Sequence, residues 1–163
     1  MGSTGCRDDS VLAAARYSPA MTDPRADYAA FTAALIENHR AIGGQVTFGP
    51  FQGRPVVLLT TTGAKSGQPR TAPLVYSLDG DTIVIMASKG GAPENPSWYA
   101  NLVANPEVTV EAAGATYQAR AVPVMGEERR RLWDAHVAQN PGFAEYATRT
   151  TREIPVIRLE RMA

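Results

Sequence analysis

The chain has 163 residues, of which 44% are hydrophobic and 20% charged, so we expect one globular domain with its own core. Its 16 basic and 16 acidic residues leave no net charge at pH 7, which argues against nucleic acid as a partner. The single cysteine, Cys6, excludes an internal disulfide and a thiolate metal cluster, and no apolar run is long enough for a membrane-spanning helix. We therefore predict that the protein is cytoplasmic and has no metal site. The alternative for its location is peripheral contact with the inner membrane.

The first part of the chain falls into a leader and a helix. Residues 1–24 are small, polar and charged, which predicts a partly disordered leader before a single domain at 25–163. From Pro24 onward, apolar residues recur at helical spacing until Gly43 and Gly44. These apolar residues are Tyr28, Phe31, Leu35, Ile36 and Ile42. The pattern predicts an amphipathic helix that packs on the body of the fold.

The rest of the chain alternates short strands with helices. Apolar and β-branched runs separated by turn residues predict strands and hairpins. The predicted strands are 55–62, 70–78, 81–87, 107–112, 116–124 and 154–159. The predicted helices are a short one begun by Asn95 and Pro96, then 127–139 and 141–149. Strands without long parallel crossovers predict an α+β, mainly antiparallel barrel or roll with peripheral helices.

Two small-residue loops contain the only lysines of the chain, Lys65 and Lys89. The first lysine lies in "TTTGAKSGQPRT", which is not a P-loop because Ala64 stands where that motif requires a glycine. Glycines on either side of the lysine still allow backbone amides to turn toward a ligand, while Ser66 and Arg70 add a hydroxyl and a charge. The pattern indicates an anion site, with an ordinary polar hairpin loop as the alternative.

The second lysine lies in "ASKGGAPENPSWY", which leaves a predicted strand and enters a short helix. That helix begins with Trp98 and Tyr99, so the two loops together could bind an aromatic ligand with an anionic tail. Packing of Trp98 in the core is the competing interpretation.

Catalysis by side chains alone has little support in this sequence. There is no Gly-x-Ser-x-Gly motif, and Cys6 lies in the leader. His39 and His136 have no partner at metal-ligand spacing, so we expect both to be structural or solvated. If the protein is an enzyme, a bound cofactor should supply the reaction.

At these loops the sequence resembles the deazaflavin-dependent nitroreductase family, whose members use coenzyme F420. The resemblance rests on "LLTTTGAKSGQPR", a following "PL", "ASKGGAPENPSWYANLVANPEV" and the closing "IPVIRLE". It implies a split β-barrel similar to FMN-binding pyridoxamine-phosphate-oxidase barrels, with F420 as cofactor and FMN as the alternative. The implied fold agrees with the antiparallel barrel or roll predicted from the strand pattern.

The resemblance also implies which residues form the site. Lys65, Ser66 and Arg70 would bind the anionic tail of the cofactor, residues 71–75 would line its ring and side chain, and the second loop would also meet the cofactor. The cofactor-binding positions are Ala64, Lys65, Ser66, Arg70, Thr71, Ala72, Pro73, Leu74, Val75, Met86, Ala87, Ser88, Lys89, Trp98, Tyr99 and Asn101. The predicted catalytic residues are Ser88, which would donate a hydrogen bond to the acceptor, and Tyr146, a proton donor or substrate wall.

The implied reaction is hydride transfer from reduced F420 to a quinone-like or nitroaromatic acceptor. Members that reduce nitro compounds have tyrosines where this chain has Val75, Asn140 and Phe143, so we expect quinones to be better acceptors. A non-catalytic deazaflavin or flavin carrier, or a barrel used only for assembly, are the alternative functions. The sequence leaves the oligomeric state open.

Overall fold

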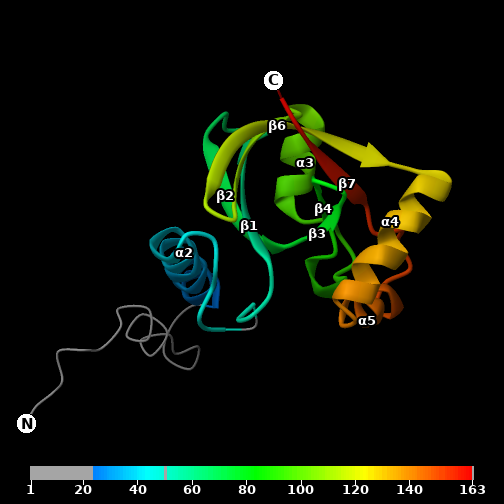
Figure 1. Cartoon of the computed structure of the whole chain (residues 1–163), viewed down its shortest axis with the longest axis horizontal. Coiled ribbons are helices and arrows are strands. Elements are labelled where there is room, and N and C mark those ends of the chain that lie inside the picture. The colour runs from blue at the N-terminus through cyan, green and yellow to red at the C-terminus, as the bar shows by residue number, and fades with distance from the viewer. Residues whose placement is uncertain (1–23, 50, 163) are drawn as a thin grey trace, which may run out of the picture.

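A computed structural model describes residues 24–49 and 51–162 (Figure 1). The predicted leader therefore lies almost entirely outside the described residues. The helices are α2 (Pro24–Ile42), α3 (Ser97–Ala104), α4 (Gly126–Gln139) and α5 (Phe143–Thr148), with a 3-10 turn η2 (Lys89–Gly91). The strands are β1 (Val56–Thr62), β2 (Pro69–Val75), β3 (Ser77–Asp79), β4 (Thr82–Met86), β5 (Glu107–Ala112), β6 (Ala115–Val124) and β7 (Val156–Arg161).

All seven strands join one antiparallel sheet, in the order β2-β1-β5-β6-β7-β4-β3. The sheet curls so strongly that α3 covers one side of it while α4 and α5 lie on the other (Figure 1). This architecture confirms the predicted α+β split β-barrel. Strands β2 and β3 form the two edges of the sheet, so β2 has a strand neighbour on one side only.

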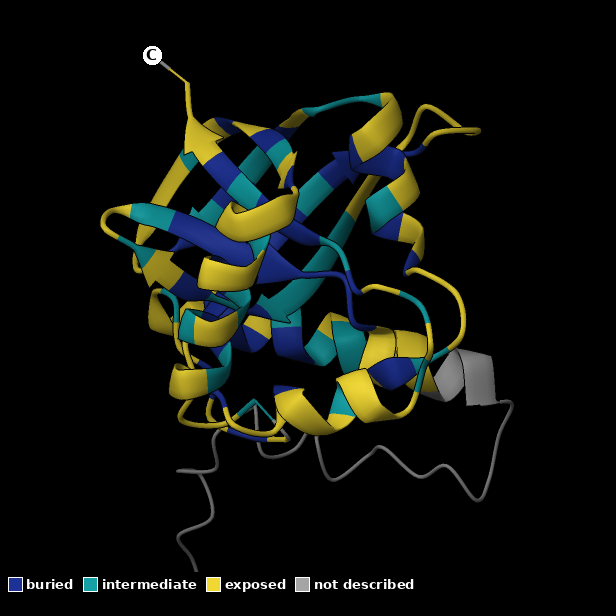
Figure 2. Cartoon of the chain, turned by 90° about the vertical axis from the view of Figure 1, so that its right-hand side faces the viewer, coloured by how far each residue is buried: buried dark blue, intermediate teal, exposed yellow. Residues whose placement is uncertain are grey.

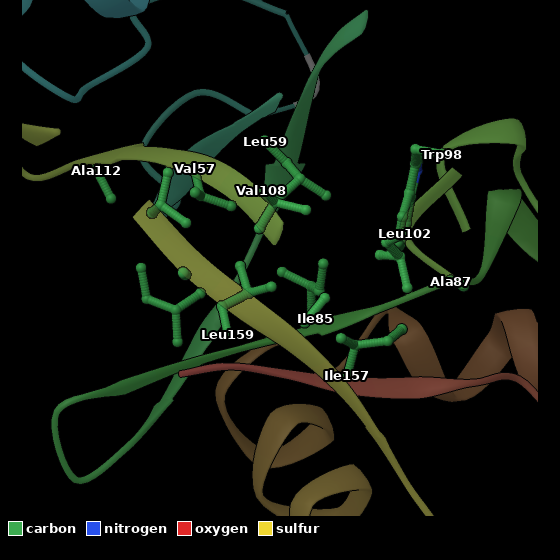
Figure 3. Packing of buried hydrophobic residues seen from close by; sticks show 14 residues of the cluster. Val57, Leu59, Ile85, Ala87, Trp98, Leu102, Val108, Ala112, Ile157 and Leu159 are labelled. Atoms are coloured by element: carbon green, nitrogen blue, oxygen red, sulfur yellow. The ribbon is translucent and has the colours of Figure 1, made fainter. Parts of the chain in front are cut away.

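Alternating side chains of the curled sheet fill the barrel interior, which we call the inner cluster. Figure 3 shows side chains from β1, β4, β5 and β7 pointing toward one another, with Trp98 and Leu102 of α3 beside them. The buried members are Val57, Leu59, Ile83, Ile85, Ala87, Trp98, Leu102, Val108, Val110, Ala112, Ala119, Ala121, Ile157 and Leu159. Because these side chains are nearly inaccessible to solvent, they form the packed core of the barrel.

The opposite face of the sheet packs under the remaining helices and forms a second, outer cluster. Its buried members are Leu35, Val46, Phe48, Val56, Val75, Val84, Met86, Val124, Leu132, Phe143, Ile154 and Val156. In Figure 2, buried segments occupy the strands, whereas the outward sides of the helices are exposed. The helix at α2 begins at Pro24 as predicted, but Tyr28 and Ile42 are 71% and 42% exposed, so the buried stripe is narrower than expected.

Two predicted elements differ from the structure. The predicted strand 70–78 is divided, because β2 ends at Val75 and β3 begins at Ser77 beside a different neighbour. Between them the Tyr76 N–H donates to the carbonyl of Pro55, and the chain turns from one edge of the sheet to the other. The short helix α3 begins at Ser97, while Pro96 keeps an extended backbone with ψ 153° and is not the first helical residue.

Candidate functional site

The first predicted loop, residues 63–68, connects β1 to β2 and is called the hairpin loop below. Its ends are joined because the Gly63 N–H donates to the Gln68 carbonyl at 2.8 Å. The Ser66 hydroxyl accepts the Gln68 N–H at 3.1 Å, and a Cβ at position 63 would collide with that hydroxyl. Gly63 therefore allows the loop to fold tightly, and Ser66 is partly used to shape it.

The hairpin loop and the start of β2 present positive charge that no acidic side chain of the described residues neutralises. Lys65 and Arg70 are exposed and have no ion pair among the described residues. The backbone N–H groups of Lys65 and Ser66 likewise lack a partner within that part of the chain. Two adjacent free amides beside two cations suit an anionic group such as a phosphate or carboxylate.

Helix α3 holds the hairpin loop from the side. Asn101 is 8% exposed, and its Oδ1 accepts the Ala64 N–H at 2.9 Å while its Nδ2 donates to Thr61 Oγ1 at 3.1 Å. Asn105 adds a longer bond of 3.5 Å to the Thr62 carbonyl. In this structure Asn101 thus positions the loop, and the amide of Ala64 is already engaged.

The second predicted loop, residues 88–96, leads from β4 to α3 and is called the helix-entry loop. Lys89 has a positive φ of 47°, and its Nζ lies 3.0 Å from Oε1 of Glu94. Its charge is therefore paired within the loop, unlike that of Lys65. Ser88 is 7% exposed, and its hydroxyl has no hydrogen bond to any described residue.

Strand alternation divides the predicted run 71–75 between two faces of the sheet. Ala72 and Leu74 pack against the inner cluster, whereas Val75 is buried in the outer cluster. Thr71 and Pro73 share the face of Val75 and are only partly buried, with Thr71 Oγ1 lying 2.8 Å from Oγ1 of Thr60. Residues of this run on both faces of β2 are therefore half-buried, and they lie beside the edge of the sheet that has no further strand neighbour.

The remaining predicted cofactor-binding positions divide in the same way. Met86 lies in the outer cluster, whereas Ala87 and Trp98 belong to the inner cluster and Tyr99 packs against it from a half-buried position. Trp98 is 8% exposed, so packing explains it in this structure. Tyr99 is the aromatic residue of α3 that keeps accessible surface.

Helix α5 brings Tyr146 to the helix-entry loop. A Cβ built on Gly91 would lie 2.8 Å from the Tyr146 carbonyl oxygen and 2.7 Å from the Cβ of Arg149, so the two segments touch closely. Tyr146 is half-buried, with its ring centroid 5.1 Å from that of Phe143. The two predicted catalytic residues, Ser88 and Tyr146, thus belong to segments that pack together.

Both histidines are structural, as predicted. His39 Nε2 donates to the carbonyl of Val56 at 2.8 Å, and His136 Nδ1 lies 2.9 Å from the hydroxyl of Ser77. Burial lowers the pKa of His136 from 6.5 to about 4, so the ring is neutral at pH 7. Its Nε2 is buried without a hydrogen-bond partner among the described residues, and the ring meets Phe143 edge-on at 4.4 Å.

The sequence did not indicate Arg152 as part of the site. Its guanidinium donates to the carbonyls of Ala87, Ser88 and Ala92. The closest of these partners in sequence is 60 residues away, so no local pattern could have identified it.

Two surface hollows lie near the start of α4, and the smaller one reaches Asn95 at the end of the helix-entry loop. The larger, of about 540 Å³, and the smaller, of about 230 Å³, share Arg129 and Glu153 in their walls. Of the predicted cofactor-binding residues, only Tyr99 borders one of them. Within residues 24–49 and 51–162 there is no cluster of three metal-binding side chains, and no helix there is long and apolar enough to cross a membrane.

Comparison with known proteins identifies similar chains. Residues 32–161 match the family model described as F420H(2)-dependent quinone reductase. The F420H(2)-dependent quinone reductase Rv1261c of Mycobacterium tuberculosis is 44% identical over 110 residues, which cover 66% of this chain and 74% of that protein. An F420-H2 dependent reductase, FDR-A, is 45% identical, with a TM-score of 0.61 over 66% of this chain and 95% of the other. A chain described as a domain-swapped dimer is 41% identical, with a TM-score of 0.63 over 77% and 95% of the two chains.

Proposed function

The chain belongs to the F420H(2)-dependent quinone reductase family, and from that premise we propose that its two loops bind coenzyme F420 and present it to a quinone. The chain is an F420-dependent reductase, and F420 is its cofactor. When bound in reduced form, that group supplies a hydride to the acceptor. The protein's own task is to hold the cofactor and the acceptor in contact, in the relative orientation that hydride transfer requires.

The described residues fit such a cofactor. Lys65, Arg70 and the two free amides of the hairpin loop suit an anionic tail. The open edge of β2 offers backbone groups and the half-buried Thr71 and Pro73 to a flat ring. This pairing of an unneutralised cationic loop with an open strand edge is the observation on which the proposal rests.

The acceptor would lie where the helix-entry loop meets α5. The Ser88 hydroxyl is free to donate a hydrogen bond to a quinone oxygen. The Tyr146 phenol is the second hydroxyl that we assign to this side, where it would line the acceptor site or give a proton to the reduced oxygen.

Nitroaromatic compounds are proposed as weaker acceptors. Val75, Asn140 and Phe143, which replace tyrosines of nitro-reducing members, are 6%, 4% and 8% exposed. They shape the wall through packing, and they offer no phenol to a nitro group. A quinone therefore fits this chain better than a nitroimidazole.

The test is a binding and oxidation experiment on the purified protein. Oxidised F420, FMN and FAD are titrated separately, and reduced F420 is then mixed with a menadione-type quinone or a nitroaromatic while its reoxidation is followed by absorbance. We expect tight binding of F420 alone and reoxidation that depends on protein and quinone. Absence of F420 binding would refute the proposal, and binding without turnover over a broad acceptor panel would favour the carrier function.

A matched control removes the proposed anion site without changing the core. Lys65→Ala should weaken F420 binding, because its ammonium is exposed and unpaired. Cytoplasmic location stays a prediction to be tested on the native protein.

A further inference from the structure

The side chain of Arg152 is bound almost wholly to the helix-entry loop. Nε donates to the Ala92 carbonyl at 3.0 Å, and Nη2 donates to the Ser88 carbonyl at 2.9 Å. Nη1 is shared between the Ala87 carbonyl at 3.2 Å and Oδ1 of Asn95 at 2.7 Å. One guanidinium thus fixes both ends of the loop, which a lysine cannot do with a single ammonium group.

The helix-entry loop needs such a support because three consecutive residues adopt a left-handed backbone conformation. Lys89, Gly90 and Gly91 follow one another with φ of 47°, 63° and 85°, all in the left-handed region. Two internal hydrogen bonds hold the turn, from the Gly91 N–H to the Ser88 carbonyl and from the Ala92 N–H to the Lys89 carbonyl. A non-glycine residue in this region costs about 1 kcal/mol or more, so an external constraint decides the loop shape.

No acidic side chain competes for Arg152. It has no ion pair among the described residues, so its donors are directed at carbonyl oxygens and one amide. Arg149 packs against Gly91 through its Cβ, but its guanidinium donates only one bond, of 3.4 Å, to the Gly90 carbonyl. Arg152 is therefore the main side-chain support of this loop.

The contact with Ser88 connects this support to the chemistry. The Ser88 carbonyl accepts both the Gly91 N–H and Arg152 Nη2, which fixes the orientation of that residue, while its hydroxyl is left free. We propose that Arg152 is a positioning residue that sets the helix-entry loop and, through it, aims the Ser88 hydroxyl at the acceptor. This inference rests on the proposed function, since it assigns Arg152 a role in that reaction.

The first measurement needs no cofactor. Amide hydrogen exchange of the free protein is compared between the parent, Arg152→Met and the control Arg158→Met. Arg158 is a partly buried arginine on β7 with 20% side-chain exposure, but its partners are Asp79, Glu128 and Glu160. We expect Gly91 and Ala92 to exchange at least ~10-fold faster in Arg152→Met and at the parent rate in Arg158→Met.

The second measurement separates binding from hydride transfer. Because the hairpin loop is untouched, Arg152→Met should change the F420 dissociation constant less than ~3-fold, while kcat with quinone falls by roughly 10- to 100-fold. Arg152→Lys keeps the charge but loses the forked geometry, so it should recover only a minor part of kcat. Arg158→Met should keep the parent kcat.

The outcomes distinguish this inference from the proposed function. Unchanged exchange at Gly91 and Ala92 in Arg152→Met, or parent kcat in Arg152→Lys, would overturn the positioning role. Equal losses of kcat in Arg152→Met and Arg158→Met would also overturn it, by showing a general stability effect. If the parent itself does not oxidise reduced F420 while the exchange result holds, the proposed function fails and the loop support remains.

Discussion

In the hairpin loop, Lys65 is exposed and has no ion pair among the described residues, whereas in the helix-entry loop Lys89 is bonded to Glu94 at 3.0 Å. The two loops are held differently as well. Asn101 of α3 secures the first through the Ala64 amide, and Arg152 secures the second through three carbonyls. Two segments with similar composition thus offer different things: the hairpin loop offers charge, and the helix-entry loop offers a fixed shape.

Gly91→Ala should produce the largest difference between the loops. Its Cβ would lie 2.7 Å from the Cβ of Arg149 and 2.8 Å from the Tyr146 carbonyl, at a φ of +85°. We expect a loss of about 2–4 kcal/mol in the free energy of unfolding, from backbone strain and overpacking together. In the hairpin loop, Gly67 has a φ of +70°, and a Cβ added there would meet no atom within 4 Å. Gly67→Ala should therefore lower the free energy of unfolding by about 1 kcal/mol, from backbone strain alone. Urea unfolding checks both, and equal losses would contradict the tight packing of the helix-entry loop.

Acidification should weaken the side of the molecule that supports the helix-entry loop. The His136 pKa is lowered from 6.5 to about 4, so the neutral ring stabilises the fold above pH 6.5, and this contribution is lost as pH falls toward 4. At about 1.4 kcal/mol for each pKa unit, the lowered pKa corresponds to about 3–4 kcal/mol, of which about 3 kcal/mol is lost between pH 7 and pH 4. Urea unfolding at pH 7 and pH 4 measures this loss. Between the two pH values, the free energy of unfolding of the parent should fall by that much more than the free energy of unfolding of His136→Gln. An identical pH dependence in the two proteins would show that His136 is not buried as a neutral ring.

The fold was predictable because its signals are local. The strand at Glu107–Ala112 was predicted with the bounds that the structure has, since alternating side chains and the turn at Gly114 define it. The division of the predicted strand 70–78 into β2 and β3 could not be predicted, because the corner at Tyr76 follows from the curl of the whole sheet. The likeness of the two lysine loops also did not reveal that Lys89 is paired with Glu94, because loop composition does not determine which side chains meet.

The candidate site was predictable where motifs identify it and not where distant residues support it. Lys65 and Ser66 lie in the exposed hairpin loop and Arg70 lies near the start of β2, and their binding role stays a prediction. Arg152 donates to a carbonyl 65 positions earlier in the chain, which no spacing rule connects. Strand alternation also separates Val75 from Leu74, so a contiguous motif does not become a contiguous binding surface.

Asn101→Ala should have a moderate effect confined to the hairpin loop. It removes the acceptor for the Ala64 N–H and the donor to Thr61, whose side chain is buried, and should cost about 1–2 kcal/mol. Asn105→Ala removes only a 3.5 Å bond and should cost less than about 0.5 kcal/mol. Amide exchange should show the Ala64 N–H released in Asn101→Ala while Gly91 and Ala92 are unchanged. Faster exchange of Gly91 would mean that the two loops are not supported independently.

The most direct test of the difference between the loops is the dissociation constant of oxidised F420 for Lys65→Ala and Lys89→Ala at low and high salt. We predict that Lys65→Ala weakens binding about 10-fold at roughly 20 mM salt, and that the loss shrinks below about 3-fold at roughly 500 mM, because an exposed charge is screened. Lys89→Ala should change binding by less than about 2-fold at either salt concentration. Parent-like binding by Lys65→Ala, or an equal loss in Lys89→Ala, would contradict the account.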